Sequence, residues 1–200
     1  YIDYGKLYEG RFPLLRRAYE RWKQMEFADA RAEAVHRLAE QRLREETREY
    51  CFYMAVKNAF GGRSWSLWDE DIRLGRAEAV REYRRRLTDE IGFYEFQQMK
   101  FEEQWGRLKA YANEQGIRII GDIPIYVAFD GADSWLHPEL FQFDEENMPA
   151  AVAGCPPDAF SATGQLWGNP LYRWEHHRKT GYAWWMRRME YSFSLCDVVR

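Results

Sequence analysis

The sequence is poor in cysteine, which argues against two common structural devices. Cys51, Cys155 and Cys196 are its only cysteines, and an odd number without paired or metal-like spacing predicts neither a disulfide framework nor a zinc site. Reduced thiols are typical of the cytoplasm, so we expect a cytoplasmic protein. His176 and His177 are adjacent, and on a helix they would point about 100° apart, too far to share one metal ion. The sequence therefore calls for no metal and no cofactor.

An excess of positive charge is also missing. Lys and Arg number 29 against 32 Asp and Glu, a net charge of −3, so the chain lacks the basic field that holds nucleic acid. The cluster Arg84-Arg85-Arg86 has two interpretations, a phosphate-binding patch or a solvated helix face. Neighbouring Glu78, Glu82 and Glu90 offer ionic partners and favour the solvated face. A neutral substrate fits this composition better than a nucleic acid does.

Long apolar runs and glycine-based catalytic motifs are absent as well. No run reaches the roughly 20 residues of a membrane span, and no signal peptide is visible. Gly61-Gly62 follows a predicted helix rather than a strand, so it does not predict a phosphate-binding loop. No serine nucleophile elbow is present. We therefore expect no membrane partner, and the sequence does not predict protein partners.

Aromatic residues, in contrast, are abundant. They form 17% of the chain and include nine tryptophans, several of which lie in predicted loops, where a hydrophobic core would not require them. A flat apolar ring with a polar edge packs well against a sugar, which presents C–H faces surrounded by hydroxyls. The alternative is burial in the core, which general burial statistics predict for about half of the tryptophans.

Residues 1–91 are predicted to form a mainly helical subdomain. Ala, Leu, Arg and Glu dominate residues 11–60, where Pro13 suits a first turn and no later proline breaks the run. Apolar residues recur at helical spacing within residues 28–49, as expected for a half-buried surface helix. The remaining predicted segments are a turn at Gly61-Gly62, a loop over residues 63–75 that carries Trp65 and Trp68, and a second charged helix over residues 76–87.

Residues 92–200 are predicted to alternate between helix and strand. Asp89 is a plausible N-cap for the helix that enters this region. Gly116 would close that helix as a left-handed cap, and the apolar run 117–120 would follow at once as a strand. The helix carries an apolar stripe, which predicts packing on a sheet. The stripe consists of Tyr94, Phe101, Trp105, Leu108 and Ala112.

Asp122 comes directly after this strand. Pro124 cannot continue a ladder of hydrogen bonds, so Asp122 is expected where the strand ends. The order of helix, short connection and parallel-type strand predicts an α/β fold, namely a partial (β/α)8 barrel with a helical insertion subdomain and a long active-site loop. The elements predicted after Asp122 are a loop subdomain over about 128–170 with a hairpin within 141–152, a helix over 182–195 and a strand over 196–200.

Several spaced blocks in a fixed order carry a resemblance to a known family, densely from about Phe93 to Arg200 and more loosely before. The blocks are 121–128 (GDIPIYVA), 132–135 (ADSW), 138–142 (PELFQ), 153–158 (AGCPPD) and 167–172 (WGNPLY). With them the chain resembles the amylomaltases, also called 4-α-glucanotransferases or disproportionating enzymes, of the α-amylase clan. The resemblance implies an enzyme without a cofactor that transfers α-1,4-glucan chains between maltooligosaccharides.

The resemblance also implies where the chemistry lies. Retaining transfer needs a carboxylate nucleophile and a carboxyl acid/base, and in this family the nucleophilic aspartate stands two positions after an arginine at the end of a barrel strand. Asp197-Val198-Val199-Arg200 matches the residues that lead into that motif. The catalytic carboxylates are therefore expected beyond this sequence, in a longer parent protein. Arg200 would orient the nucleophile; the alternative is a surface arginine at a strand end.

Substrate contacts are implied for Asp122 and for the long loop. Asp122 would line the cleft, although an aspartate in this context also commonly caps a turn. Ala159 stands where relatives often have tyrosine, which affects acceptor grip and chain-length preference, and Gly131 stands where serine is usual. Asp158 and Ser161 would contact sugar or form turns. The loop residues expected to stack on glucose rings or bond their hydroxyls are Phe160, Gln165, Trp167 and Asn169.

Two other functions stay open. An α-glucan hydrolase of the same clan would use similar residues and pass the glycosyl group to water. A non-catalytic glucan-binding module would need only the substrate contacts, and it is the literal prediction for a chain without catalytic carboxylates. The helical portion over residues 2–87 would either bind a second glucan or only shape the cleft.

Overall fold

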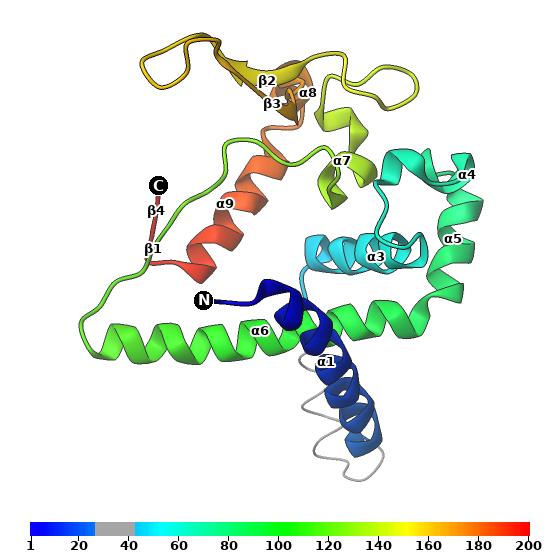
Figure 1. Cartoon of the computed structure of the whole chain (residues 1–200), viewed down its shortest axis with the longest axis vertical. Helices are drawn as coiled ribbons and strands as arrows, with labels where there is room; N and C mark the ends of the chain where they lie inside the picture. Colours follow the sequence, from blue (N-terminus) through cyan, green and yellow to red (C-terminus); the bar gives the residue numbers. More distant parts are fainter. Residues whose placement is uncertain (27–42) are drawn as a thin grey trace.

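The computed structural model describes residues 1–26 and 43–200 (Figure 1). Most of the surface helix predicted over residues 28–49 lies outside the described residues. The described helices are α1 (Tyr4–Glu26), α3 (Glu45–Ala59), α4 (Glu70–Arg73), α5 (Ala77–Arg86), α6 (Thr88–Glu114), α7 (Ala132–Leu136), α8 (Trp174–Lys179) and α9 (Ala183–Leu195), with 3-10 turns η1 (Trp65–Leu67) and η2 (Pro138–Leu140). The described strands are β1 (Ile120–Gly121), β2 (Val152–Cys155), β3 (Gln165–Pro170) and β4 (Val198–Val199).

Helix α1 packs on the first half of α6. The helix begins at Tyr4, so Pro13 lies inside it and not in its first turn, which corrects the sequence prediction. A proline there removes one backbone hydrogen bond, and aromatic packing on α6 offsets that loss. Tyr19 is buried with its ring centroid 5.7 Å from those of both Phe93 and Phe96.

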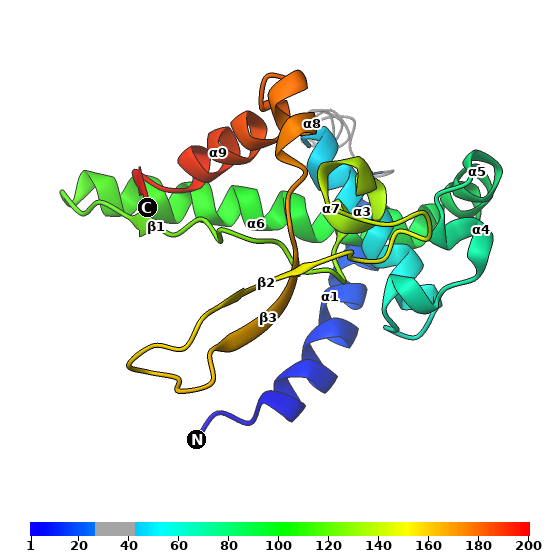
Figure 2. The ribbon, with the colours of Figure 1, turned by 90° about the horizontal axis from the view of Figure 1, so that it is seen from above.

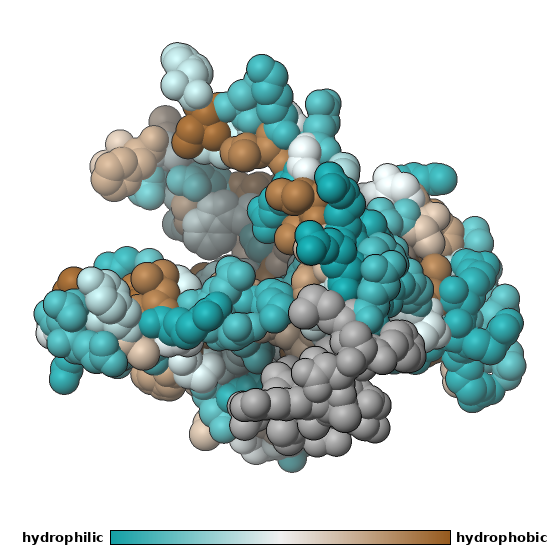
Figure 3. Space-filling view, turned by 90° about the horizontal axis from the view of Figure 1, so that it is seen from below, coloured by the Kyte–Doolittle hydropathy of each residue, from teal (hydrophilic) through white to brown (hydrophobic). Residues whose placement is uncertain are grey.

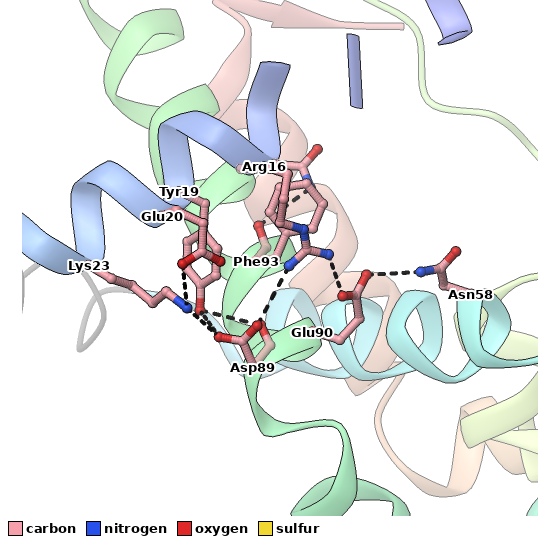
Figure 4. Close-up of polar contacts among 9 residues, drawn as sticks. Arg16, Tyr19, Glu20, Lys23, Asn58, Asp89, Glu90 and Phe93 are labelled. Atoms are coloured by element: carbon pink, nitrogen blue, oxygen red, sulfur yellow. Dashed lines mark hydrogen bonds and ion pairs between the residues drawn. The ribbon is translucent and has the colours of Figure 1, made fainter. Parts of the chain in front are cut away.

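Ion pairs fix the same interface between α1 and α6 (Figure 4). Arg16 donates to Glu90, and Lys23 Nζ lies 2.7 Å from Asp89 Oδ1. The N-cap prediction for Asp89 is wrong, because α6 already begins at Thr88 and its N-cap makes no side-chain hydrogen bond. The Asp89 carboxylate instead binds α1, and the hydrogen bond from Lys23 lowers its pKa.

Tryptophans that the sequence predicted in a loop form part of a core. Trp65 and Trp68 are 0% and 4% exposed and pack with Trp135 of α7 against α3. The loop prediction for residues 63–75 is wrong in part, because η1 and α4 lie within it and both indoles are turned inward. Together with Trp184, four of the nine tryptophans are buried, close to the half predicted from burial statistics.

The helix predicted over residues 76–87 is confirmed as α5. Arg84, Arg85 and Arg86 are exposed at its end. The Arg84 guanidinium lies 4.1 Å from the ring centroid of Phe52, and that of Arg86 lies 4.2 Å from the ring centroid of Tyr83. Guanidinium groups that stack on aromatic rings while the arginines stay exposed to water are compatible with a solvated helix face.

Helix α6 ends as predicted, at a glycine. Gly116 has a φ of +75°, its N–H bonds the Asn113 carbonyl, and the Ile117 N–H bonds the Ala112 carbonyl, each at 2.9 Å. These are the two bonds of a Schellman motif. The prediction that α6 packs on a sheet is wrong for the described residues: its main neighbours are α1, α3, α5 and α9, and Phe101 on the predicted stripe is 42% exposed.

The strands predicted on either side of the long loop are confirmed as neighbours. β1 and β4 are parallel, with Ile120 opposite Val198 and Gly121 opposite Val199. Both strands are shorter than predicted, because only these two pairs of residues are in the register of the parallel hydrogen-bond ladder. Gly121 is needed here, since a Cβ at this position would collide with the side chain of Cys196.

The long loop contains two hairpins. The one predicted within residues 141–152 is present as a tight turn, in which the Asp144 N–H bonds the Met148 carbonyl at 2.9 Å. The other was not predicted: β2 and β3 are antiparallel, with Cys155 opposite Gln165. Figure 2 shows this β2–β3 hairpin projecting away from the helices.

The predicted division into 1–91 and 92–200 stays a prediction. Its boundary falls inside α6, so one continuous helix joins the two parts. Helix α9 matches the helix predicted over residues 182–195.

In the space-filling view, hydrophilic residues cover most of the face seen from below, and the surface is deeply hollowed on one side (Figure 3). None of the described helices has the combination of length and apolar character that crossing a bilayer would require.

Candidate functional site

A carboxylate and a guanidinium meet just beyond the ends of β1 and β4. Arg200 Nε donates to Asp122 Oδ1 at 2.8 Å and Arg200 Nη2 donates to Asp122 Oδ2 at 2.9 Å, a bidentate pair. The hydrogen bonds from Arg200 lower the pKa of Asp122, and the same pairing raises the pKa of Arg200. Both side chains are exposed. The charges are thus fixed in orientation while remaining open to a ligand.

The backbone on both sides of Asp122 is held by Arg200, the residue directly after β4. The Arg200 N–H bonds the Gly121 carbonyl at 2.9 Å, and the Ile123 N–H bonds the Arg200 carbonyl at 3.1 Å. Asp122 therefore sits between two ladder bonds to the residue that its side chain also binds. This geometry follows from the parallel register, which places the residues after Gly121 and Val199 side by side.

Asp197 has a structural role that the sequence did not reveal. Its Oδ2 accepts the Ile119 N–H at 2.8 Å and the Asn113 side-chain amide at 2.9 Å. The hydrogen bond from Ile119 is the main cause that lowers the pKa of Asp197. Asp197 thus ties the start of β4 to the end of α6 and to the start of β1. The one signal for this role in the sequence was the position of Asp197 at the start of a predicted strand.

The tip of the β2–β3 hairpin is a defined turn. The Phe160 and Ser161 N–H groups donate to Asp158 Oδ1 at 2.9 and 2.8 Å, and Ser161 Oγ donates to the Gly164 carbonyl at 2.7 Å. Of the two interpretations of Asp158 and Ser161, the turn is the one observed. Phe160 is 96% exposed at this tip, where its ring is available to a ligand.

Three predicted contact residues lie on β3, and the side chains of two of them bond each other. Trp167 Nε1 donates to Gln165 Oε1 at 2.9 Å, and its ring centroid lies 6.2 Å from that of Tyr126. Trp167 is 48% exposed. Asn169 is used differently, because its Nδ2 donates to the Val127 carbonyl at 2.7 Å. This bond occupies one amide donor, and the Asn169 side chain holds the backbone before α7.

The structure therefore brings the predicted site residues together in two groups. Asp122 and Arg200 form one group, while Gln165 and Trp167 form the other. Within the described residues no hydrogen bond joins the two groups. In Figures 1 and 2 the hairpin extends toward the same side of the molecule as β1 and β4.

The described residues offer no metal centre. No three His, Cys, Asp or Glu side chains in residues 1–26 and 43–200 gather as metal ligands would. All three cysteines are free, and burial raises the pKa of Cys51 to about 12. The rings of His176 and His177 stand at 87° to each other. What the site offers a ligand is an ionic pair, exposed aromatic faces and amide groups.

These features define a class of protein: one with parallel strands whose carboxyl ends present charged side chains, and with an aromatic hairpin inserted after a strand. The model of the 4-α-glucanotransferase family matches residues 1–200. The chain belongs to this family, and the resemblance stated from its sequence blocks is confirmed.

Individual relatives support this assignment. The 4-α-glucanotransferase of Thermus thermophilus is 45% identical over 201 residues, and that of Streptococcus pneumoniae is 44% identical over 200 residues. The solved amylomaltase from Streptococcus agalactiae, in complex with acarbose, matches the whole chain with a TM-score of 0.90 and 39% identity. Each match covers 100% of this chain and 39% of the relative. The chain therefore spans about two fifths of the length of these relatives.

Proposed function

We propose that this chain is part of a 4-α-glucanotransferase that transfers α-1,4-glucan chains between maltooligosaccharides by a retaining double displacement in the cytoplasm. The observation that carries the proposal is the Asp122–Arg200 pair beside the ends of parallel strands, in a chain whose full length matches the family. The complete enzyme would hold the glycosyl group on a carboxylate outside these 200 residues. The 4-hydroxyl of a second glucan would then accept it.

The proposed role of Arg200 is to hold and orient that nucleophilic carboxylate. Its Nε and Nη2 are used by Asp122, and among the described residues no partner takes Nη1. A guanidinium has five N–H donors, so it can bind a second carboxylate while keeping the first. The hydrogen bonds from Arg200 lower the pKa of Asp122 further and so favour its ionised form, which is a strong acceptor for sugar hydroxyls.

We further propose that the chain forms a segment of a (β/α)8 barrel. In such a barrel, consecutive strands are parallel and joined through helices, and the site lies at their carboxyl ends. Two features support this: β1 and β4 pair in parallel, and helices α7 to α9 lie between them in the chain. Asp122 and Arg200 are then at the face where a barrel places its chemistry.

Trp167 and Phe160 are proposed to form an aromatic lid that excludes water from the covalent intermediate. Exclusion of water separates transfer from hydrolysis. Gln165, already bonded to the Trp167 indole, would fix that ring and bond a sugar hydroxyl. Asn169 would act mainly by holding Val127.

The test uses the full-length protein and maltotriose. Transfer yields longer oligosaccharides together with glucose, whereas a hydrolase yields free sugars without longer products, and a binding module yields neither. For Trp167→Ala we expect the ratio of hydrolysis to transfer to rise by up to about 10-fold, roughly 1.4 kcal/mol of differential stabilisation. Leu166→Ala is the matched control, since Leu166 is 81% exposed on the opposite face of β3. An unchanged ratio for Trp167→Ala would remove the lid from the mechanism.

A further inference from the structure

An irregular segment, residues 123–130, connects β1 to α7; we call it the strap. It crosses the molecule from the β1–β4 pair to the helices (Figure 1). Its residues belong to no helix or strand. Backbone carbonyls of such a segment need partners from outside when they are shielded from water.

Side chains from separate parts of the chain supply partners for five of the eight strap carbonyls. The donors and acceptors are Arg188 Nη2 to Pro124 at 2.6 Å, Tyr172 Oη to Ile125 at 3.0 Å, Asn169 Nδ2 to Val127 at 2.7 Å, Ser134 Oγ to Ala128 at 2.8 Å and Trp65 Nε1 to Phe129 at 2.7 Å. The strap is thus held as a strand would be held, by side chains in place of a neighbouring backbone.

Of the five bonded carbonyls of the strap, the one that Arg188 binds is nearest to Asp122 in sequence. Arg188 bonds the carbonyl of Pro124, two residues after Asp122. Its guanidinium carbon lies 5.1 and 5.2 Å from the ring centroids of Trp184 and Trp185, so cation–π contacts fix the direction of the donor. A charged donor also makes a stronger hydrogen bond than a neutral one.

Two clamps therefore bracket the backbone that carries Asp122. On one side the Arg200 backbone bonds Gly121 and Ile123, and on the other Arg188 bonds Pro124. Pro124 has no N–H and a restricted φ, so its carbonyl is the next point at which the chain can be held. Without Arg188 this carbonyl loses its partner, and the first side-chain bond that holds the strap is then the one from Tyr172 to Ile125, three residues after Asp122.

We infer that Arg188 is a positioning residue for the Asp122–Arg200 pair, acting through the Pro124 carbonyl. The inference rests on the proposed transfer reaction for its kinetic consequence. Its structural consequence, a tighter backbone at Ile123, does not depend on that reaction. The two can therefore be tested separately.

The test compares Arg188→Met with Arg187→Met in the full-length protein. Methionine keeps an apolar stem beside the two tryptophans and removes the donor. Arg187 is the adjacent residue on α9, but it pairs with Glu46 at 2.6 Å and donates no hydrogen bond to the strap in the described structure. For Arg188→Met we expect kcat for maltotriose transfer to fall at least about 10-fold, because a shift of roughly 1 Å can cost on the order of 100-fold. Arg187→Met should retain the wild-type kcat.

Hydrogen exchange at the Ile123 and Arg200 amides supplies the readout that a merely stabilising residue would not move. We expect faster exchange at both amides in Arg188→Met, and partial recovery of exchange protection and kcat in Arg188→Lys, which keeps one charged donor. If Arg188→Met does not fold, Arg188→Lys should show smaller changes in the same direction. Unchanged exchange, or unchanged kcat in an active enzyme, would overturn the inference. A wild-type protein without transfer activity would instead disprove the proposed function, and the exchange data would still decide the clamp.

Discussion

Asp122 and Arg200 are two exposed side chains held in one geometry, which is unusual because exposed ion pairs contribute little to stability. Long charged side chains lose rotamer freedom when they pair, and water weakens their attraction. Here the backbone lowers that cost, since both residues emerge from paired strands and each side of Asp122 is bonded to Arg200. The pair is therefore better understood as a prepared binding group than as a source of stability.

His137 is a histidine whose pKa is strongly raised by two neighbouring carboxylates. Its Nδ1 lies 3.4 Å from Glu139 Oε1 and its Nε2 lies 3.0 Å from Glu49 Oε2. The hydrogen bond with Glu139, then that with Glu49, raises the pKa of His137 from 6.5 to about 10. Because the folded pKa lies above the unfolded one, the stabilisation is complete below about pH 6.5 and is lost as pH rises through about 10.

We therefore predict a pH-dependent effect of His137→Gln. Near pH 6 the substitution should lower the free energy of unfolding by about 1.5–3 kcal/mol, the size of a hydrogen bond to a charged group. The difference from wild type should shrink steadily toward pH 10. Denaturant unfolding of both proteins across this range measures it. A difference that is constant with pH would show that the fold does not raise the pKa of His137.

The sequence revealed some of these residues and concealed others, for a physical reason. Asp122 was predictable because an apolar run before it and Pro124 after it mark a strand end locally. Arg200 was predictable from the family blocks. Asp197 and Asn169 were not assigned their structural roles, because each binds backbone far away in sequence, at Ile119 and Val127. A contact across 42 or 78 residues leaves no local pattern.

At the scale of elements, the docking of α1 on α6 depends on the absence of a side chain. A Cβ at Gly92 would lie 2.6 Å from Tyr19 Oη, and Tyr19 is buried among rings. Gly106 lies on the same helix with nothing within 4 Å of its Cβ position. The two glycines thus differ in surroundings while sharing one helix.

Alanine at these two positions should have opposite effects on stability. Gly106→Ala should stabilise the protein by about 0.5–1 kcal/mol, since alanine favours helix. Gly92→Ala gains the same propensity but displaces Tyr19, and overpacking of this kind costs about 1–3 kcal/mol. We expect a net loss for Gly92→Ala, measured as a lower midpoint of urea unfolding. A gain equal to that of Gly106→Ala would mean that Tyr19 moves without cost.

Elements whose ends carry a residue with a specific local role were predictable from the sequence. Elements defined only by hydrogen bonds between strands were not. The end of α6 was predicted from Gly116, because only a residue at ease with positive φ completes a Schellman motif. The β2–β3 hairpin was missed because β2 carries Gly154 and a register shift between Val152 and Gly154. A strand that lacks alternation gives no period-two signal.

At the scale of the whole molecule, Asp130 joins the strap to α3 and η1, which we call the helical layer. Its Oδ1 accepts the Tyr53 hydroxyl at 2.8 Å and the Trp65 N–H at 3.2 Å, while Oδ2 pairs with Lys57. Trp65 is fully buried in the core beside it. Sequence alone predicted Trp65 in a loop, because an indole that is buried by distant partners has no local signature. The contacts of Asp130 with these distant residues could therefore be identified only from the structure.

Asp130→Asn should loosen this join. The amide keeps one acceptor for Tyr53 and Trp65 but turns an N–H group toward Lys57, so this ammonium loses its ionic partner and keeps the Tyr53 hydroxyl at 3.4 Å. We expect the free energy of unfolding to fall by about 1–3 kcal/mol. Glu78→Gln, which removes an exposed pair with Arg81, is the control and should change it by less than about 0.5 kcal/mol.

Transfer activity in the full-length protein distinguishes two roles of this join. If the helical layer shapes the cleft through the strap, Asp130→Asn should also lower kcat, because the strap leads from Asp130 back to Asp122. If the layer only adds stability, kcat measured well below the unfolding temperature should equal that of wild type. The first result is expected, since side-chain hydrogen bonds fix the strap between these two aspartates.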